Sequence, residues 1–271
     1  MLTKQEYLLS IPFEYIIAFS RGTRLIRRNG YYTKKDFVQH LLRNLRVSEC
    51  KKLYEFYGNG VSCRDAVKYF LEKYPTGELV SKAFVNHLIK TTKDLGMLMY
   101  EFPIQKTRVD ILRISNFSYA YEVKSQRDRV DRLHYQLPML GRIFESVYLV
   151  FSFSVKDKIK KMVDKKVGLY TYTTKEDQIV FTIEREPVEI DEYEPHAQLE
   201  LFGMDELRSI YFDLYKEKPK NKVKRELINL FLKNIDRHEI NLLFKKTIQK
   251  RDRNQTRSYM LMNRASPDGF L

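Results

Sequence analysis

The sequence predicts a mixed α/β protein whose β-sheet core lies between a helical N-terminal region and a helical C-terminal region. Three observations predict this class. Short β-favouring runs follow one another in the middle of the chain, one amphipathic helical stretch interrupts them, and both flanks carry apolar residues at helical spacing. The order helix, three strands, helix, strand is typical of a mixed sheet that contains a hairpin and a right-handed crossover.

The N-terminal region, residues 1–75, is expected to be mainly helical. Apolar residues recur near the helical repeat from 33 to 74, and a Gly-Asn-Gly turn at 58–60 separates two of the predicted helices. Pro-Thr-Gly at 75–77 then breaks the chain, and Glu78 opens a helix that should run to about residue 91.

The predicted core spans residues 76–155. After its first helix we expect four strands, at 97–104, 109–114, 119–123 and 147–153. Between the third and fourth strands, apolar residues from 130 to 144 recur at steps of three and four, which predicts a crossover helix. Pro138 removes a backbone donor within it, so we expect a kink or a second segment there.

Two further regions follow the core. Residues 156–195 form a basic segment: lysines are dense from 156 to 166, a further β-hairpin is expected at 168–172 and 179–183, and an acidic, proline-bounded stretch forms a linker. Residues 196–271 show helical spacing again and form the C-terminal helical region.

Composition narrows the class of function. The 271 residues carry a net charge of +14, which favours polyanionic partners, with nucleic acid ahead of membrane surfaces. No apolar run is long enough to span a bilayer, and the N-terminus does not fit a signal peptide, so we expect a cytoplasmic protein. Motifs for phosphate-binding loops, dinucleotide binding, zinc proteases and serine hydrolases are missing from the sequence.

Three charged residues in the predicted strands are candidates for chemistry. Glu122 and Lys124 alternate along one strand and therefore project from the same face. Asp110 lies near the start of the preceding strand, and antiparallel pairing through a turn at 115–118 would bring it beside Glu122. Two convergent carboxylates suit Mg²⁺ or Mn²⁺, and the lysine would lie within reach of the attacked phosphate.

These residues resemble the PD-(D/E)XK nuclease superfamily, which has the restriction-endonuclease-like fold. The resemblance covers about residues 76–155 and rests on the D-x(11)-E-x-K spacing of Asp110, Glu122 and Lys124. Arg108-Val109-Asp110, the strand motif E-V-K-S at 122–125 and R-L-x(2)-Q at 132–136 are similar to a group of uncharacterised bacterial members. Val109 departs from the family pattern, because it stands where the family name has proline.

The resemblance implies a role for each matching residue. Asp110 and Glu122 would ligate Mg²⁺, with the backbone carbonyl of Val123 as a further ligand, and Lys124 would position or activate the nucleophilic water. Gln136 would be an auxiliary active-site residue.

Many members of this superfamily supply a further glutamate ahead of the sheet. Two residues compete for this role: Glu101 lies closer to the Arg-x-Asp strand, whereas Glu78 better matches the helical placement. The residues slightly favour Glu101. Arg129 and Arg132 lie seven and four positions before Gln136 on the same predicted helix, where they could line the cleft and contact phosphate.

The function expected from the sequence is Mg²⁺- or Mn²⁺-dependent hydrolysis of phosphodiester bonds, in DNA rather than RNA. The alternative is a module of the same fold that binds nucleic acid or docks a partner without cutting, because fold does not fix function. A third hypothesis is that the basic helices have a structural or membrane-surface role. A homodimer or a partner protein would suit a nuclease that cuts both strands, but no interface is visible in the sequence.

Overall fold

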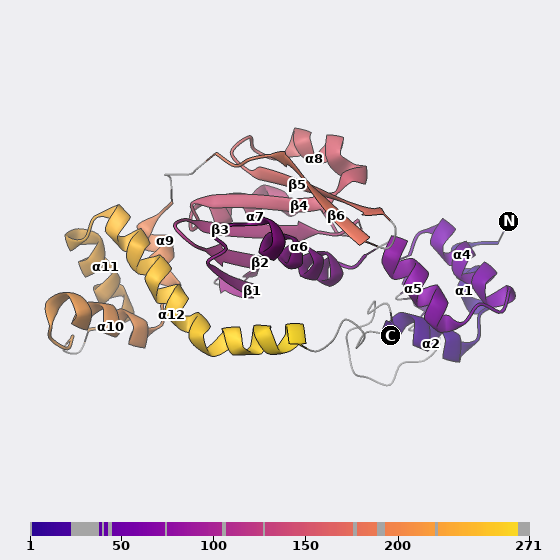
Figure 1. Cartoon of the computed structure of the whole chain (residues 1–271), viewed down its shortest axis with the longest axis horizontal. Coiled ribbons are helices and arrows are strands. Elements are labelled where there is room, and N and C mark those ends of the chain that lie inside the picture. The colour runs from indigo at the N-terminus through magenta and orange to yellow at the C-terminus, as the bar shows by residue number, and fades with distance from the viewer. Residues whose placement is uncertain are drawn as a thin grey trace.

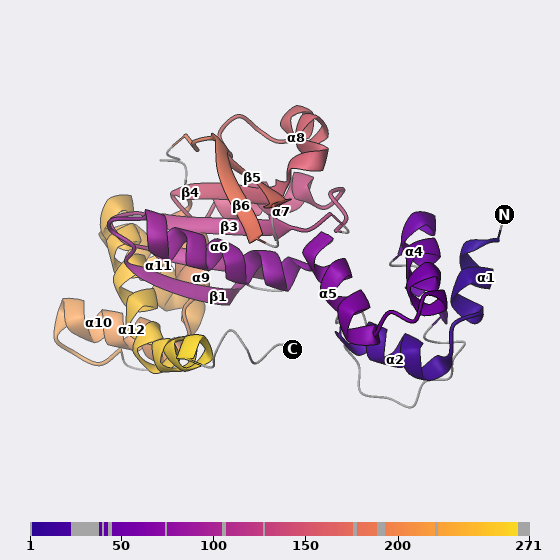
Figure 2. The same ribbon diagram turned by 45° about the vertical axis from the view of Figure 1, so that its right-hand side comes forward.

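The computed structural model describes residues 2–22, 38–39, 41–42, 45–73, 75–104, 107–126, 128–175, 178–188, 193–219 and 222–264. Side chains are described up to residue 251, apart from those of 13, 21, 22 and 72. A six-stranded sheet forms the middle of the molecule, with one group of helices beyond each end of it (Figures 1 and 2).

The N-terminal helices have a hydrophobic core of their own. Leu8, Phe19, Leu53 and Phe70 are fully buried in it, and the rings of Phe19 and Phe70 meet edge to face at 4.9 Å. This core shares no buried residue with the two cores that flank the sheet. The helices are α1 (Lys4–Leu9), α2 (Phe13–Gly22), α4 (Val47–Gly58) and α5 (Cys63–Lys73).

The sheet is mixed and its strands are neighbours in chain order. The pairs β1–β2, β2–β3 and β5–β6 are antiparallel, whereas β3–β4 and β4–β5 are parallel. All residues of the central strand β4 are buried, as expected for a parallel strand that is covered on both faces. The strands are β1 (Met97–Ile104), β2 (Thr107–Ile114), β3 (Ser118–Lys124), β4 (Ser146–Ser152), β5 (Gly168–Lys175) and β6 (Gln178–Arg185).

Helices cover both faces of the sheet. On one face lies α6 (Gly77–Thr91), which begins where the Thr76 hydroxyl accepts the N–H of Leu79, and its Phe84 packs edge to face on Tyr121 at 5.2 Å. On the other face, α7 (Leu133–Gly141) buries Leu133, Leu137 and Leu140 against the sheet. The alternation of side chains along β3 therefore assigns Tyr121 to the α6 face and Glu122 to the α7 face.

The C-terminal helices belong to the core on the α7 face, where Phe244 is fully buried and its ring lies 6.0 Å from that of Phe144. A buried charge also fixes them: Glu145 accepts hydrogen bonds from the backbone N–H of Ser118, from Asn241 and from Lys245. The remaining helices are the 3₁₀ turn η1 (Phe153–Val155), α8 (Lys156–Met162), α9 (Pro195–Glu200), α10 (Met204–Tyr215), α11 (Lys224–Asn234) and α12 (Arg237–Arg264).

The predicted fold class is confirmed as a mixed α/β fold with helical flanks. The four expected strands and the further hairpin are present, each within two or three residues of its expected bounds. The crossover helix is shorter than expected, since α7 covers 133–141 rather than 130–144, and Pro138 lies inside it. Within the described part of the chain, no helix is both long and apolar enough to cross a membrane.

Candidate active site

The candidate site lies where strands β2 and β3 separate. Their antiparallel ladder ends at the pair Ile111 and Tyr121, and Asp110 and Glu122 are the next residues beyond it. The backbone N–H of Val123, one residue further along β3, donates to Oδ2 of Asp110 at 2.7 Å. The Asp110 side chain thus takes the place of a backbone acceptor in the ladder between β2 and β3. Its carboxylate is held against β3 beside Glu122.

Glu122 and Lys124 project together from the same face of β3. The Lys124 ammonium donates to Oε1 of Glu122 at 2.6 Å. Glu122 is only 3% exposed, and the side chain of Lys124 is largely buried. A charge-assisted hydrogen bond in such a sheltered place is stronger than a surface ion pair and holds both groups in position.

Helix α7 brings Gln136 to the same cluster. Its apolar stripe packs on the sheet through Leu133 and Leu137, which directs Gln136 toward Glu122. The Gln136 side chain hydrogen-bonds to Glu122. Its Oε1 atom is buried and has no hydrogen-bond partner among the described residues, although a buried amide oxygen ordinarily has one.

Burial dominates the electrostatics of the two carboxyl groups. Burial first, and then the negative charge of Glu122, raise the pKa of Asp110 to about 7, against the opposing effects of the Val123 N–H and Lys124. Burial also raises the pKa of Glu122, against the opposing effects of Lys124 and Gln136. The cluster therefore holds more negative charge than Lys124 alone stabilises, and it favours a proton or another cation.

The two competing glutamates lie outside this hydrogen-bonded cluster. Glu101 stands opposite Asp110 in the β1–β2 register, but its φ of 49° interrupts the regular strand, and its exposed carboxylate pairs with Arg108 at 2.9 Å. Glu78 lies in the first turn of α6 and forms an ion pair with Lys82 at 3.4 Å. Neither is among the groups that perturb the pKa of Asp110 or Glu122.

The structure separates the two arginines. Arg132 is the N-cap of α7 and its carbonyl accepts the N–H of Gln136 at 3.1 Å, so its expected helical spacing to Gln136 is present. Arg129 lies in the preceding loop, and its expected place on this helix is wrong. The guanidinium of Arg129 donates two hydrogen bonds to Asp131, at 3.1 and 2.8 Å, and this local pairing suits a loop conformation. Arg132 is exposed at the N-terminus of α7.

Asp128 is a further acidic residue that sequence reasoning missed. Its Oδ2 accepts the N–H of Ser125 at 2.6 Å and lies near Gly77, where a Cβ would be 3.5 Å away. Its negative charge raises the pKa of both Asp110 and Glu122. Ser and Asp are residue types that favour turns, and this was the signal that the sequence offered for the segment 125–128.

The geometry thus gathers Asp110, Glu122, Lys124 and Gln136 and leaves Glu78 and Glu101 aside. A family model described as "Bacteriophage P4 protein cII" matches residues 76–268. No curated protein and no solved structure matches the chain. The matched part begins at the N-terminus of α6 and includes the sheet, the candidate site and the C-terminal helices. The chain therefore belongs to the bacteriophage P4 protein cII family.

Proposed function

We propose that the chain is a Mg²⁺- or Mn²⁺-dependent endonuclease of the PD-(D/E)XK type, which hydrolyses phosphodiester bonds in DNA and acts in the cytoplasm. One observation carries the proposal: Asp110, Glu122 and Lys124, 14 residues apart at most, converge at the point where β2 and β3 separate. Two sheltered carboxylates and an ammonium are the groups that metal-assisted phosphodiester hydrolysis needs.

The residues fit a divalent metal ion. Burial and neighbouring negative charges raise the pKa values of Asp110 and Glu122, so a cation beside them would be stabilised, and the buried Oε1 of Gln136 has no partner among the described residues. Asp110, Glu122 and the carbonyl of Val123 would hold the ion, with water completing the shell as Mg²⁺ prefers. When bound, Mg²⁺ supplies Lewis-acid stabilisation of a phosphoryl oxygen and lowers the pKa of the attacking water.

The side chains of the chain supply the remaining functions. Lys124 carries three donors and no acceptor, so it can hold a water molecule or a phosphoryl oxygen beside the carboxylates. Its ammonium would stabilise the negative charge that develops on the attacked phosphate. Gln136, which packs from α7, would orient Glu122 through their hydrogen bond.

Charge supports a nucleic-acid substrate. The net charge of +14 favours association with a polyanion, and the exposed Arg132 lies where the segment that follows β3 enters α7. We extend the proposal to DNA rather than RNA and to a homodimer or a partner protein that places two sites on opposite strands. Parallel assays on DNA and RNA test the first of these extensions, and light scattering tests the second.

Cleavage of supercoiled plasmid tests the proposal. The purified chain is incubated with Mg²⁺, with Mn²⁺ or with EDTA, beside Lys124→Ala and beside Lys175→Ala, which removes the same charge from an exposed position on β5. We expect metal-dependent nicking or linearisation that Lys124→Ala abolishes and Lys175→Ala retains. Intact plasmid under every condition, together with retained DNA binding, would favour the non-catalytic binding module instead.

A further inference from the structure

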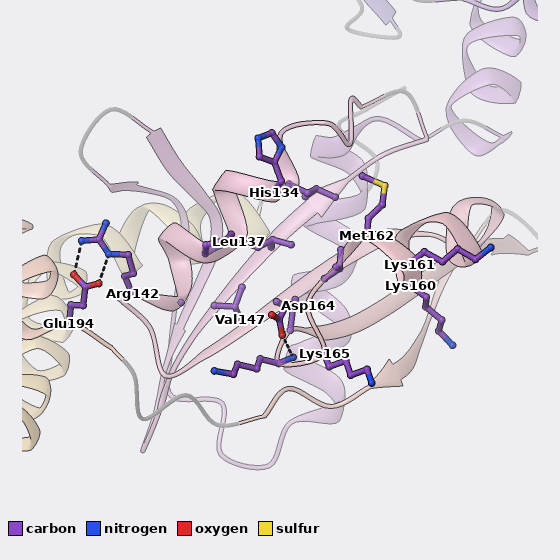
Figure 3. Close-up of a pocket in the computed structure, with 16 residues that line it drawn as sticks. His134, Leu137, Arg142, Val147, Lys160, Lys161, Met162, Asp164, Lys165 and Glu194 are labelled. Atoms are coloured by element: carbon purple, nitrogen blue, oxygen red, sulfur yellow. Dashed lines mark hydrogen bonds and ion pairs between the residues drawn. The ribbon is translucent and has the colours of Figure 1, made fainter.

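A groove runs between α7 and the segment that leads from α8 to β5. It encloses about 920 Å³ and is lined on one side by residues of α7 and on the other by residues 160–167 (Figure 3). Leu137, Val147 and Val163 contribute an apolar floor, and the exposed Met162 and Pro138 stand at its edge. The groove is therefore apolar inside, although the segment that forms it is rich in lysine.

The rim of the groove is cationic. Lys160, Lys161 and Lys165 extend from it (Figure 3), and Lys166 and Arg142 also line it. Some of these charges are occupied: Glu194 binds the guanidinium of Arg142 through two hydrogen bonds of 2.6 Å, and Glu184 lies 3.5 Å from Lys160.

Two of the rim lysines are open to a ligand. Asp164 directs Oδ1 to the backbone N–H of Lys166 at 2.8 Å rather than to an ammonium group. Within the described part of the chain, the exposed ammonium groups of Lys161 and Lys165 have no ion-pair partner. Both are therefore available for an anion outside the chain.

The groove lies next to the candidate active site. Helix α7 separates the two: Gln136 faces Glu122, while His134 and Pro138 of the same helix line the groove. Helix α8 starts after the end of β4, and the parallel pairing of β3 with β4 places Lys124 opposite Phe151 at that end. A linear polymer in the groove would thus pass close to the site.

We propose that this groove binds a single DNA strand and guides it along α7 toward the site formed by Asp110, Glu122 and Lys124. The proposal rests on the proposed function in taking DNA as the substrate. A single strand presents phosphates and exposed base faces together, and these match a cationic rim over an apolar floor. A duplex buries its base faces by stacking, so only its phosphates could interact with the groove, through the cationic rim.

Binding of a fluorescein-labelled single-stranded oligonucleotide tests the groove. Fluorescence anisotropy is measured in EDTA, so that binding is separated from cleavage. The variant Lys161→Glu/Lys165→Glu reverses two rim charges, and the control Lys233→Glu/Lys246→Glu reverses two exposed charges on α11 and α12. Both pairs lower the net charge equally, so a difference between them reports position rather than total charge.

We expect the groove variant to weaken binding by about tenfold or more and to lower the slope of log K against log salt by about one unit per lysine. The control should bind within about twofold of wild type. Equal losses in the two variants would overturn the proposal, as would tighter binding of a duplex of the same length or no binding of the single strand by wild type.

The plasmid assay separates this proposal from the proposed function. Binding that depends on Lys161 and Lys165, combined with no metal-dependent cleavage of either the plasmid or the single strand, would retain the groove and refute the nuclease. Cleavage that depends on Lys124, combined with binding that does not change in Lys161→Glu/Lys165→Glu, would retain the nuclease and refute the groove.

Discussion

Replacing Asp110 by asparagine should stabilise the metal-free protein at neutral pH. Folding raises the pKa of Asp110 from 3.8 to about 7, which corresponds to about 4 kcal/mol of unfolding free energy lost once the group is ionised in both states. The folded protein keeps a proton between these two pH values that the unfolded chain releases. Stability of the wild type therefore falls as pH rises from about 4 to about 7, and asparagine removes this loss.

The asparagine variant keeps the local structure, because its Oδ1 can accept the N–H of Val123 that Asp110 now accepts at 2.7 Å. Urea unfolding followed by circular dichroism, in EDTA and at several pH values between 5 and 8, measures the effect. We expect Asp110→Asn to exceed wild type by at least about 1 kcal/mol above pH 7 and the difference to shrink toward acid pH. Asp157→Asn, an exposed control on α8, should change stability by less than about 0.5 kcal/mol.

Saturating Mg²⁺ should make wild type more stable than Asp110→Asn, the reverse of the order in EDTA. At a concentration one hundred times its dissociation constant, a ligand of the folded state adds about 2.7 kcal/mol to wild type, and Asp110→Asn, which lacks one ligand charge, should gain much less. A variant that is less stable than wild type in EDTA, or a difference that does not change with pH, would refute the electrostatic reasoning. Equal Mg²⁺ responses of the two proteins would refute Asp110 as a metal ligand.

Three further predictions concern the fold. Lys245→Met leaves the buried Glu145 without its cation, now 3.1 Å away, and should cost about 3–5 kcal/mol in urea unfolding, part of which Glu145→Gln in the same chain recovers. Gly96→Ala would place a Cβ 2.1 Å from the carbonyl oxygen of Ile114 at a φ of 64°, so we expect a loss of more than about 2 kcal/mol or no folded protein. A chain ending at residue 195 should bind a hydrophobic dye and be cleaved rapidly by protease, because α9–α12 complete the core on the α7 face.

The convergence of the charged residues could be predicted from the sequence because it depends on short-range rules. Alternation along a strand places Glu122 and Lys124 on one face, and the short turn after β2 fixes the register that brings Asp110 beside Glu122. The position of Glu101 could not be predicted in this way. It depends on one positive φ angle, which the residue types around it do not encode.

The limit of the predicted core at residue 155 shows what local patterns leave out. The resemblance to the nuclease superfamily ends there, whereas the family match continues to residue 268 and the core on the α7 face includes Leu199, Phe231 and Phe244. Phe244 packs on Phe144, and Asn241 and Lys245 hydrogen-bond to Glu145, each across about 100 residues of the chain. A contact of that range leaves no periodicity in a single sequence. The C-terminal helices therefore complete the layer that carries α7 and Gln136, and the candidate site depends on residues far outside its own motif.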